Sequence, residues 1–289
     1  MDIEPSICMK YYCYLLLAFL IFGLGVKAQT LKLKSNRIHK NKELETNLAN
    51  SNITLEIRED IIFKTIKQGN VPHFLINLVK ISHTEKIDGK DYTIEFYVTP
   101  DYLSIGNNLD HFYMPMTPIL AQKVANKFNC SLPTKKMVDL IYTNAAIKLA
   151  PLPIPPSASM TKFYVFKQHD ELVKEQLKTF ETRHLNGELT AGNKKDVIIS
   201  NKIYTENKPK VVIYGWHQLN GKPIQPAYNK HTNTWADYSH GIRLVQNKVR
   251  VNGKKTTIAK VLADKKLCIL LSDEGQIEKS FYPITKYEL

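Results

Sequence analysis

The spacing of hydrophobic residues predicts a β-hairpin in the first third of the chain. Two runs rich in β-branched and aromatic residues, Leu75–His83 and Tyr92–Val98, flank the dipeptide Asp88-Gly89. This dipeptide is typical of the two-residue turns that join antiparallel strands. Before the hairpin, the apolar positions from 61 to 66 predict a short helix that ends at Gly69.

The middle of the chain has the spacing of amphipathic helices. An apolar residue recurs at every fourth position from 120 to 128 after Thr117-Pro118, a pair typical of a helix start. A second helix is expected to begin at Pro133-Thr134. The proline-rich segment 151–156 then interrupts the pattern, and a third helix is expected after it, capped by Asp170.

The last third of the chain changes to short runs of β-branched residues. Three such runs predict strands: Val197–Ile199, Val211–Tyr214 and Ile242–Val245. Asn252-Gly253 predicts a further tight turn. Hairpins and helices follow one another without regular alternation. The expected fold class is therefore α+β, with a mixed or antiparallel sheet, hairpins and several packed helices.

The first 28 residues have the pattern of a secretory signal peptide. An uncharged apolar run, Leu15–Phe22, follows Lys10, and Val26-Lys27-Ala28 places small residues where a signal peptidase cleaves. The run is shorter than the roughly 20 residues that span a membrane. We therefore expect residues 1–28 to be removed before Gln29, which leaves an exported protein, periplasmic or extracellular, with no transmembrane anchor.

The remaining chain is expected to fold as one unit. Residues 29–50 are polar and basic and are interpreted as a loose arm. Residues 51–289 are interpreted as a single composite α+β domain. Within it, the segment 151–156 is either an internal boundary or a rigid crossing of the surface.

Composition and charge narrow the class of partner. A content of 43% hydrophobic and 23% charged residues excludes a collagen-like or mostly disordered chain. The formal net charge is +13, and removal of residues 1–28 leaves it unchanged, because that segment carries two acidic and two basic residues. The expected partner is an anionic cell-wall or extracellular polymer. No basic stripe interleaved with aromatic residues specifies nucleic acid, and a merely solvated cationic surface remains the alternative.

Two cysteines, Cys130 and Cys268, remain after the signal peptide is removed. Their spacing leaves open whether they form a disulfide. Both lie in apolar surroundings and are interpreted as small buried hydrophobic residues. The chain has no CxxC motif or ladder of cysteine and histidine, so no structural zinc site is expected.

The segment from residue 211 to 245 gathers the candidate functional residues. It combines histidines, both tryptophans and several polar residues in loops beside predicted strands, where binding and catalytic groups concentrate. The candidate catalytic residues are His217, His240, Asp237 and Ser239. The candidate substrate-binding residues are Arg243, Trp216, Trp235, Tyr238, Gln225 and His231.

Two mechanisms follow from these residue types. In the first, His217 or His240 acts as general acid and base, Asp237 orients it, and Arg243 holds an anionic group. Ser239 is a candidate nucleophile, although no G-x-S-x-G motif supports it. In the second, the histidines of this segment hold a divalent metal that activates water. The first is favoured, with no cofactor, because the spacings match no familiar metal motif.

The loop between the two histidines suggests that they meet. Gly221, Pro223 and Pro226 are residues suited to turning the chain back on itself. If the strands on either side belong to one sheet, His217 and His240 share one pocket. This shared pocket is the central structural expectation for an enzyme.

The stretch Ser239-His240-Gly241-Ile242-Arg243 resembles the catalytic motif of the L,D-transpeptidases of bacterial cell walls. In that family the motif reads Ser-His-Gly-Cys, then an apolar residue and Arg, and an upstream histidine on a strand corresponds to His217. Here Ile242 stands where the family has its nucleophilic cysteine. Over most of its length the chain is also similar to a family of secreted bacterial proteins, on segments such as Tyr214–His217 and Asp237–Gly241. That similarity implies export and no particular reaction.

The leading interpretation is an exported protein that acts on a cell-envelope or extracellular polymer. A hydrolase or transferase with a histidine-centred site is expected, with peptidoglycan as the favoured substrate. The alternative is a non-catalytic polysaccharide- or cell-wall-binding protein, in which aromatic residues stack on sugars. A third interpretation is an interaction or structural protein. A rigid pocket that joins the two histidines favours the enzyme, and dispersed histidines beside an open aromatic surface favour binding.

Overall fold

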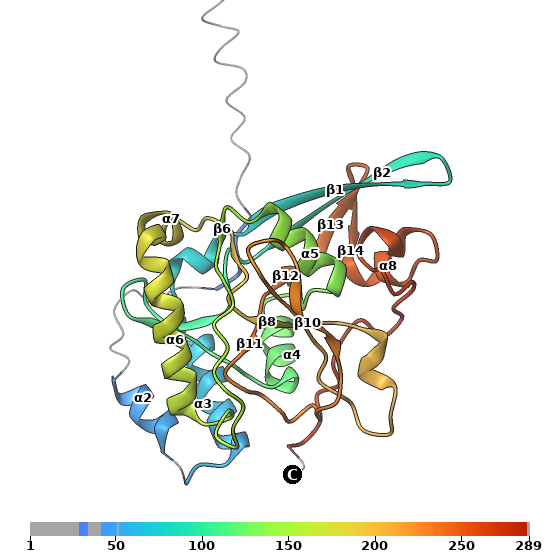
Figure 1. Ribbon diagram of the computed structural model, residues 1–289. Coiled ribbons are helices and arrows are strands. Elements are labelled where there is room, and N and C mark those ends of the chain that lie inside the picture. The colour runs from blue at the N-terminus through green and yellow to red at the C-terminus, as the bar shows by residue number, and fades with distance from the viewer. Residues whose placement is uncertain (1–28, 34–41, 51, 288–289) are drawn as a thin grey trace, which may run out of the picture.

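A six-stranded sheet is the largest sheet of the computed structural model, which describes residues 29–33, 42–50 and 52–287 (Figure 1). Its strand order is β14-β13-β2-β12-β5, and β1 pairs with β2. Its strands are β1 (Val79–Ile87), β2 (Lys90–Val98), β5 (Cys130–Ser131), β12 (Val245–Gln246), β13 (Lys248–Val251) and β14 (Lys254–Thr257). The expected signal peptide lies outside the described residues.

Both predicted hairpin turns are confirmed. Asp88 and Gly89 join β1 to β2 with φ angles of 48° and 76°, and Asn252 and Gly253 join β13 to β14 with 47° and 76°. Positive φ at both central residues is the requirement of a type I′ turn, which matches the twist of the strands. These four residues therefore set the register of the two hairpins.

A second sheet of four strands carries four of the ten candidate site residues, Trp216, His217, Gln225 and His240. Its order is β10-β9-β8-β11, in which β8 runs antiparallel to β9 and parallel to β11. The strands are β8 (Lys195–Val197), β9 (Ile213–His217), β10 (Pro223–Tyr228) and β11 (His240–Gly241). Two short pairs complete the strands: β3 (Ser104–Gly106) with β4 (His111–Tyr113), and β6 (Ile147–Lys148) with β7 (Thr190–Ala191).

Helices pack around these sheets, so the fold class is α+β as the sequence predicted (Figure 1). The α-helices are α2 (Lys42–Ala49), α3 (Leu55–Lys67), α4 (Pro118–Lys127), α5 (Lys135–Asn144), α6 (Phe163–Leu177), α7 (Glu181–Leu185) and α8 (Ile258–Ala263). Short 3₁₀ helices are η1 (His73–Ile76), η2 (Lys178–Phe180), η3 (Asn201–Tyr204) and η4 (Leu267–Leu270). Thr117 and Thr134 cap α4 and α5 by accepting a hydrogen bond from the backbone, as expected.

Two sequence expectations about local structure are wrong. Leu75 lies in a 3₁₀ turn, so the first strand begins only at Val79. Asp170 does not cap the third helix, because α6 already begins at Phe163. Asp170 lies inside that helix, where its carboxylate accepts the backbone N–H of Tyr113 at 2.8 Å. This buried hydrogen bond to a distant segment explains why an acidic residue occurs within the helix.

One hydrophobic core contains side chains from both sides of the proline-rich segment 151–156. Phe96 and Ile141 precede that segment, Val197 and Leu244 follow it, and all four are buried in the same cluster. In the expected arm, Leu31 and Leu48 also pack into this core. Within residues 29–33, 42–50 and 52–287, no helix combines the length and apolar character needed to cross a membrane.

Candidate functional site

One end of the four-stranded sheet brings together residues that are far apart in the sequence. Strand β8 begins there, antiparallel β9 ends there, and parallel β11 begins there. Lys195 stands opposite Gly215 on one side and opposite His240 on the other. We call the polar residues at this end the rim cluster, and its members are His169, Asn193, Lys194, Lys195, Trp216, Asp237, Tyr238 and His240.

The expected shared pocket of His217 and His240 is wrong. Successive residues of a strand point to opposite faces, so Lys195 and Asp196 mark the two faces of β8. His240 stands opposite Lys195, and its charged neighbours are Asp237 and Lys195. The ring of His217 instead packs on helix α5, with Nε2 3.0 Å from Asp139 and the ring stacked on Tyr142. The positive φ angles of Gly215 and Trp216 interrupt the alternation of faces along β9 just before it. The two imidazoles therefore do not form one catalytic pair.

His217 is held by residues of α5. Its Nε2 lies 3.0 Å from Oδ1 of Asp139, which also accepts the hydroxyl of Tyr214 at 2.7 Å. The imidazole stacks on the ring of Tyr142 with centroids 4.5 Å apart. Burial acts to raise the pKa of Asp139, but the hydrogen bonds from His217 and Tyr214 hold it below its usual value. The geometry fits an oriented histidine whose carboxylate partner remains 39% exposed.

Asp237 organises the turn that leads to His240. Its Oδ1 accepts the hydroxyl of Ser239 at 2.5 Å and the backbone N–H of Ser239 at 2.8 Å, and its Oδ2 accepts the Trp235 indole at 3.3 Å. Burial acts to raise the pKa of Asp237, but His240 and the hydrogen bonds from Ser239 lower it to about 2. Nε2 of His240 lies 3.8 Å from Oδ2, beyond hydrogen-bonding distance. Ser239 is fully buried and engaged with this carboxylate, so it does not have the geometry of a nucleophile activated by a histidine.

Arg243 is part of the core, which does not agree with its expected contact to substrate. Its side chain is fully buried, and its two Nη atoms donate to the carbonyl oxygens of Thr99 and Thr190 at 2.8 and 2.7 Å. The guanidinium lies 4.3 Å from the centre of the Tyr102 ring, and its Nε lies 4.0 Å from Oδ1 of Asp196. Arg243 therefore neutralises buried charge and joins three segments of the chain.

Sequence reasoning missed the lysine at the centre of the rim cluster. Nζ of Lys194 lies 2.8 Å from Nδ1 of His169 in α6 and 2.7 Å from the carbonyl oxygen of Tyr238. Burial lowers the pKa of Lys194 to about 8, and burial together with Lys194 lowers that of His169 to about 2. The sequence contained one indication of this lysine, the pair Lys194-Lys195 close before a β-branched run. Successive residues of a strand point to opposite faces, so one of two adjacent lysines there is expected to point inward.

Some polar atoms of the rim cluster have no partner among the described residues. These atoms include Nδ2 and Oδ1 of Asn193, Nε1 of Trp216, and both ring nitrogens of His240. The three side chains are buried. Burial also lowers the pKa of His240 to about 4, so its ring is neutral at pH 7. Buried polar atoms are normally paired, so this concentration marks the rim cluster as a functional candidate.

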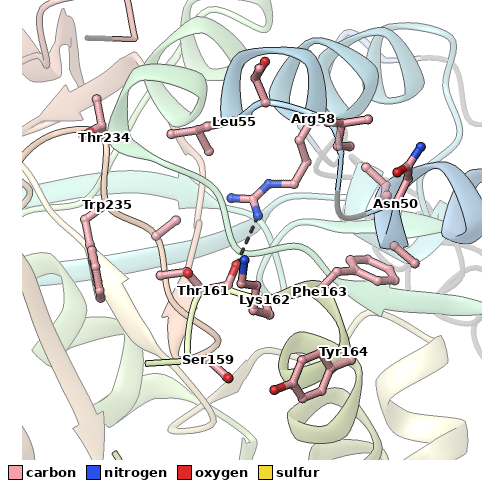
Figure 2. Close-up of a pocket in the computed structure, with 15 residues that line it drawn as sticks. Asn50, Leu55, Arg58, Ser159, Thr161, Lys162, Phe163, Tyr164, Thr234 and Trp235 are labelled. Carbon is pink, nitrogen blue, oxygen red and sulfur yellow. Dashed lines mark hydrogen bonds between the residues drawn. The ribbon is translucent and has the colours of Figure 1, made fainter. Parts of the chain in front are cut away.

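A groove opens beside the rim cluster, between α3, the start of α6 and the loop before β11. Its volume is about 710 Å³ (Figure 2). Arg58 reaches across it from α3 and donates to the carbonyl oxygen of Thr161 at 3.1 Å. Trp235, Phe163 and Tyr164 contribute aromatic surface, and Lys162 adds a second cation. None of the fifteen residues that line the groove is Asp or Glu.

The other expected binding residues lie on different surfaces. His231 stacks on Trp235 with centroids 4.4 Å apart, next to the groove. Gln225 lies on the outer strand β10, where its amide donates to the carbonyl oxygen of Pro226. Trp216 and Tyr238 belong to the rim cluster, 6.3 Å apart between ring centroids. Of the ten expected site residues, only Trp235 lines the groove.

Neither the two cysteines nor a group of metal-ligating side chains forms a further site in the described part of the chain. Cys130 and Cys268 are both free and buried, and burial raises the pKa of the Cys130 thiol to about 12. Among the described residues, no three side chains of His, Cys, Asp or Glu are grouped as metal ligands.

Comparison with known proteins found no match to this chain. No protein-family model, curated protein or solved structure matches this chain. The function has to be inferred from the rim cluster and the groove themselves.

Proposed function

We propose that this chain is an exported protein that binds an anionic cell-envelope or extracellular polymer, with peptidoglycan as the first candidate. The observation that carries the proposal is the groove of about 710 Å³ in which Trp235 stands among cationic side chains and no carboxylate (Figure 2). Aromatic faces stack on sugar rings, and the cations Arg58 and Lys162 attract acidic groups. The net charge of +13 acts in the same direction over a longer range.

The test is retention of the mature chain by purified peptidoglycan sacculi in a sedimentation assay. We expect Trp235→Ala and the double variant Arg58→Gln with Lys162→Gln each to weaken retention about tenfold or more. Lys222→Gln removes a charge from the exposed turn between β9 and β10 and is the matched control. Retention of the wild type is expected to fall as salt rises, because screening acts over about 10 Å at 0.1 M salt.

Equal retention of the wild type and both groove variants contradicts the proposal. Retention that does not change between low and high salt contradicts the contribution of charge. A parallel assay with an acidic polysaccharide and with a neutral one assigns the polymer class, because the groove is expected to prefer the acidic one.

A hydrolase or transferase acting on the same polymer is the second candidate function. The observation that favours it is Lys194, a buried amine beside a neutral imidazole, with a pKa of about 8. Such an amine exchanges its proton near neutral pH, which is the requirement of a general base. Incubation with sacculi followed by mass spectrometry of the soluble products tests it. Products that form with the wild type and are lost in Lys194→Met support catalysis, and no products from the wild type oppose it.

A further inference from the structure

A long segment without helix or strand connects β6 to α6. It comprises fourteen residues, 149–162, and includes four prolines, Pro151, Pro153, Pro155 and Pro156. Segments of this length within a compact fold are uncommon and are usually either linkers or functional lids and binding loops. Because proline fixes φ at each of these four positions, the middle of this segment is stiff. We call residues 149–162 the strap.

Side chains rather than backbone ladders hold the middle of the strap. Among the described residues, no backbone hydrogen bond joins residues 150–158 to another segment. The Gln176 side chain instead donates to the carbonyl oxygen of Ala150 and accepts its N–H, both at 3.0 Å. The Tyr238 hydroxyl donates to the carbonyl oxygen of Ile154 at 2.9 Å and accepts its N–H at 2.8 Å. Segments with so few backbone contacts are among the first to open locally in a native protein.

The strap packs on both residues that hold the buried amine of Lys194. Nζ of Lys194 lies between Nδ1 of His169 and the carbonyl oxygen of Tyr238. Besides its hydroxyl contacts, Tyr238 donates its backbone N–H to the carbonyl oxygen of Met160 at 3.1 Å. Burial and Lys194 lower the pKa of His169, and the backbone of Leu152 acts in the opposite direction. The strap therefore contributes to keeping Lys194 completely buried.

The strap also lines the two cavities on either side of this contact. Three residues near its end line the groove (Figure 2): Ser159, Thr161 and Lys162. Pro151 and Pro153 line a second cavity of about 330 Å³ beside the turn between β9 and β10. Tyr238 connects the groove to the amine, because its N–H binds Met160, between two lining residues, and its carbonyl oxygen binds Lys194.

We propose that the strap is a movable cover that closes Lys194 off from the groove and opens to admit the polymer bound there. This inference rests on the proposed function and deepens it, because it regulates access to the amine that the second candidate function uses. In the closed state, the strap keeps water and polymer away from Lys194 and His169. When the side-chain contacts to Ala150 and Ile154 break, the amine becomes accessible from the groove.

The test is acetylation of the full mature chain by a water-soluble N-hydroxysuccinimide ester at about pH 8, the pKa of Lys194. Mass spectrometry reads the modification of each lysine. We expect Lys194 to react about tenfold faster in Tyr238→Phe than in the wild type, because this variant loses both hydrogen bonds to Ile154 and keeps the ring. Tyr204→Phe is the matched control, since it loses a hydroxyl that donates to the carbonyl oxygen of Phe281, and neither residue holds the strap. The control should leave the reaction of Lys194 unchanged.

Iodoacetamide labelling of the buried Cys130 thiol in parallel samples reports global unfolding. Faster acetylation of Lys194 in Tyr238→Phe with Cys130 still unreactive supports local opening of the strap. Equal acceleration at both residues, or equal acetylation of Lys194 in the wild type and the variant, overturns the proposal. Gln176→Met removes both hydrogen bonds to Ala150 and takes the place of Tyr238→Phe, with the same outcomes, if that variant does not fold. Retention by sacculi without local opening rejects the strap alone, whereas absent retention rejects the proposed function.

Discussion

Replacement of Arg243 by Met tests whether this arginine stabilises the fold. Methionine has a similar length and fills the same volume, but it removes the charge and all five N–H donors. The change leaves the carbonyl oxygens of Thr99 and Thr190 without the donors that now lie 2.8 and 2.7 Å away. It also removes a cation that acts on the buried carboxylates Asp101 and Asp196, of which Asp101 keeps its contact with Nε2 of His184 at 2.8 Å. The perturbation is therefore electrostatic rather than a loss of packing.

The expected loss in the free energy of unfolding is about 3–5 kcal/mol, the range observed when one partner of a buried charged network is removed. Each unpaired carbonyl is worth about 1–3 kcal/mol and is part of this total, since contributions within one network are not additive. For a chain of this length, 1 kcal/mol shifts the melting temperature by about 2–4 °C. The melting temperature should therefore fall by roughly 6–20 °C.

Urea unfolding followed by tryptophan fluorescence and by circular dichroism measures the loss. Arg250→Met is the matched control, because Arg250 is only half-buried and donates to a backbone carbonyl, that of Gly253, in a hydrogen bond exposed to solvent. The control should lose less than about 0.5 kcal/mol. If Arg243→Met and Arg250→Met differ by less than about 1 kcal/mol, the structural role assigned to Arg243 is wrong.

Four further predictions concern other parts of the chain. Gly241→Ala should destabilise by about 1–3 kcal/mol in thermal unfolding, because its new Cβ would lie 2.6 Å from an aromatic carbon; an unchanged melting temperature would refute this. Burial lowers the pKa of His240 from its ordinary value of 6.5 to about 4 in the folded protein, so the folded chain binds this proton more weakly than the unfolded chain does. Its neutral folded form therefore makes stability fall as pH drops from 6.5 to 4, by up to about 1.4 kcal/mol per unit, and His240→Asn should flatten this profile in urea titrations at several pH values. Cys130 and Cys268 should react with a thiol reagent only after unfolding, and fast labelling of the native chain would contradict their burial. N-terminal sequencing of envelope material should begin at Gln29, and an intact Met1 would reject export.

The local structure was predictable where neighbouring residues decide it. Asp88-Gly89 and Asn252-Gly253 form their turns because these pairs tolerate positive φ, whatever surrounds them. Thr117 starts α4 because its side chain satisfies a free backbone N–H within its own helix. Asp170 has the residue type of a cap, but its position was decided by the distant backbone N–H of Tyr113.

The candidate site was only partly predictable, for a similar reason. The sequence drew attention to the segment around Trp216, Asp237 and His240, and the structure brings these residues to one end of a sheet. It could not show that His217 packs on helix α5 instead of beside His240, because that contact depends on the positive φ angles of Gly215 and Trp216 and on the position of α5 against β9. Lys194 escaped notice because a lysine is normally exposed, and only the fold buries its amine against His169.

The sequence by itself determined the α+β class, the two hairpin turns, two helix starts and the strong positive charge. These depend on residue type and short-range spacing, which are present in the unfolded chain. Only the tertiary structure decided that Arg243 lies beside buried carboxylates, that Trp235 lines a cationic groove with Arg58, and that residues of the rim cluster keep buried polar atoms without a partner among the described residues. Each of these depends on strand order and on burial, which join residues up to about 180 positions apart and remove water from between them.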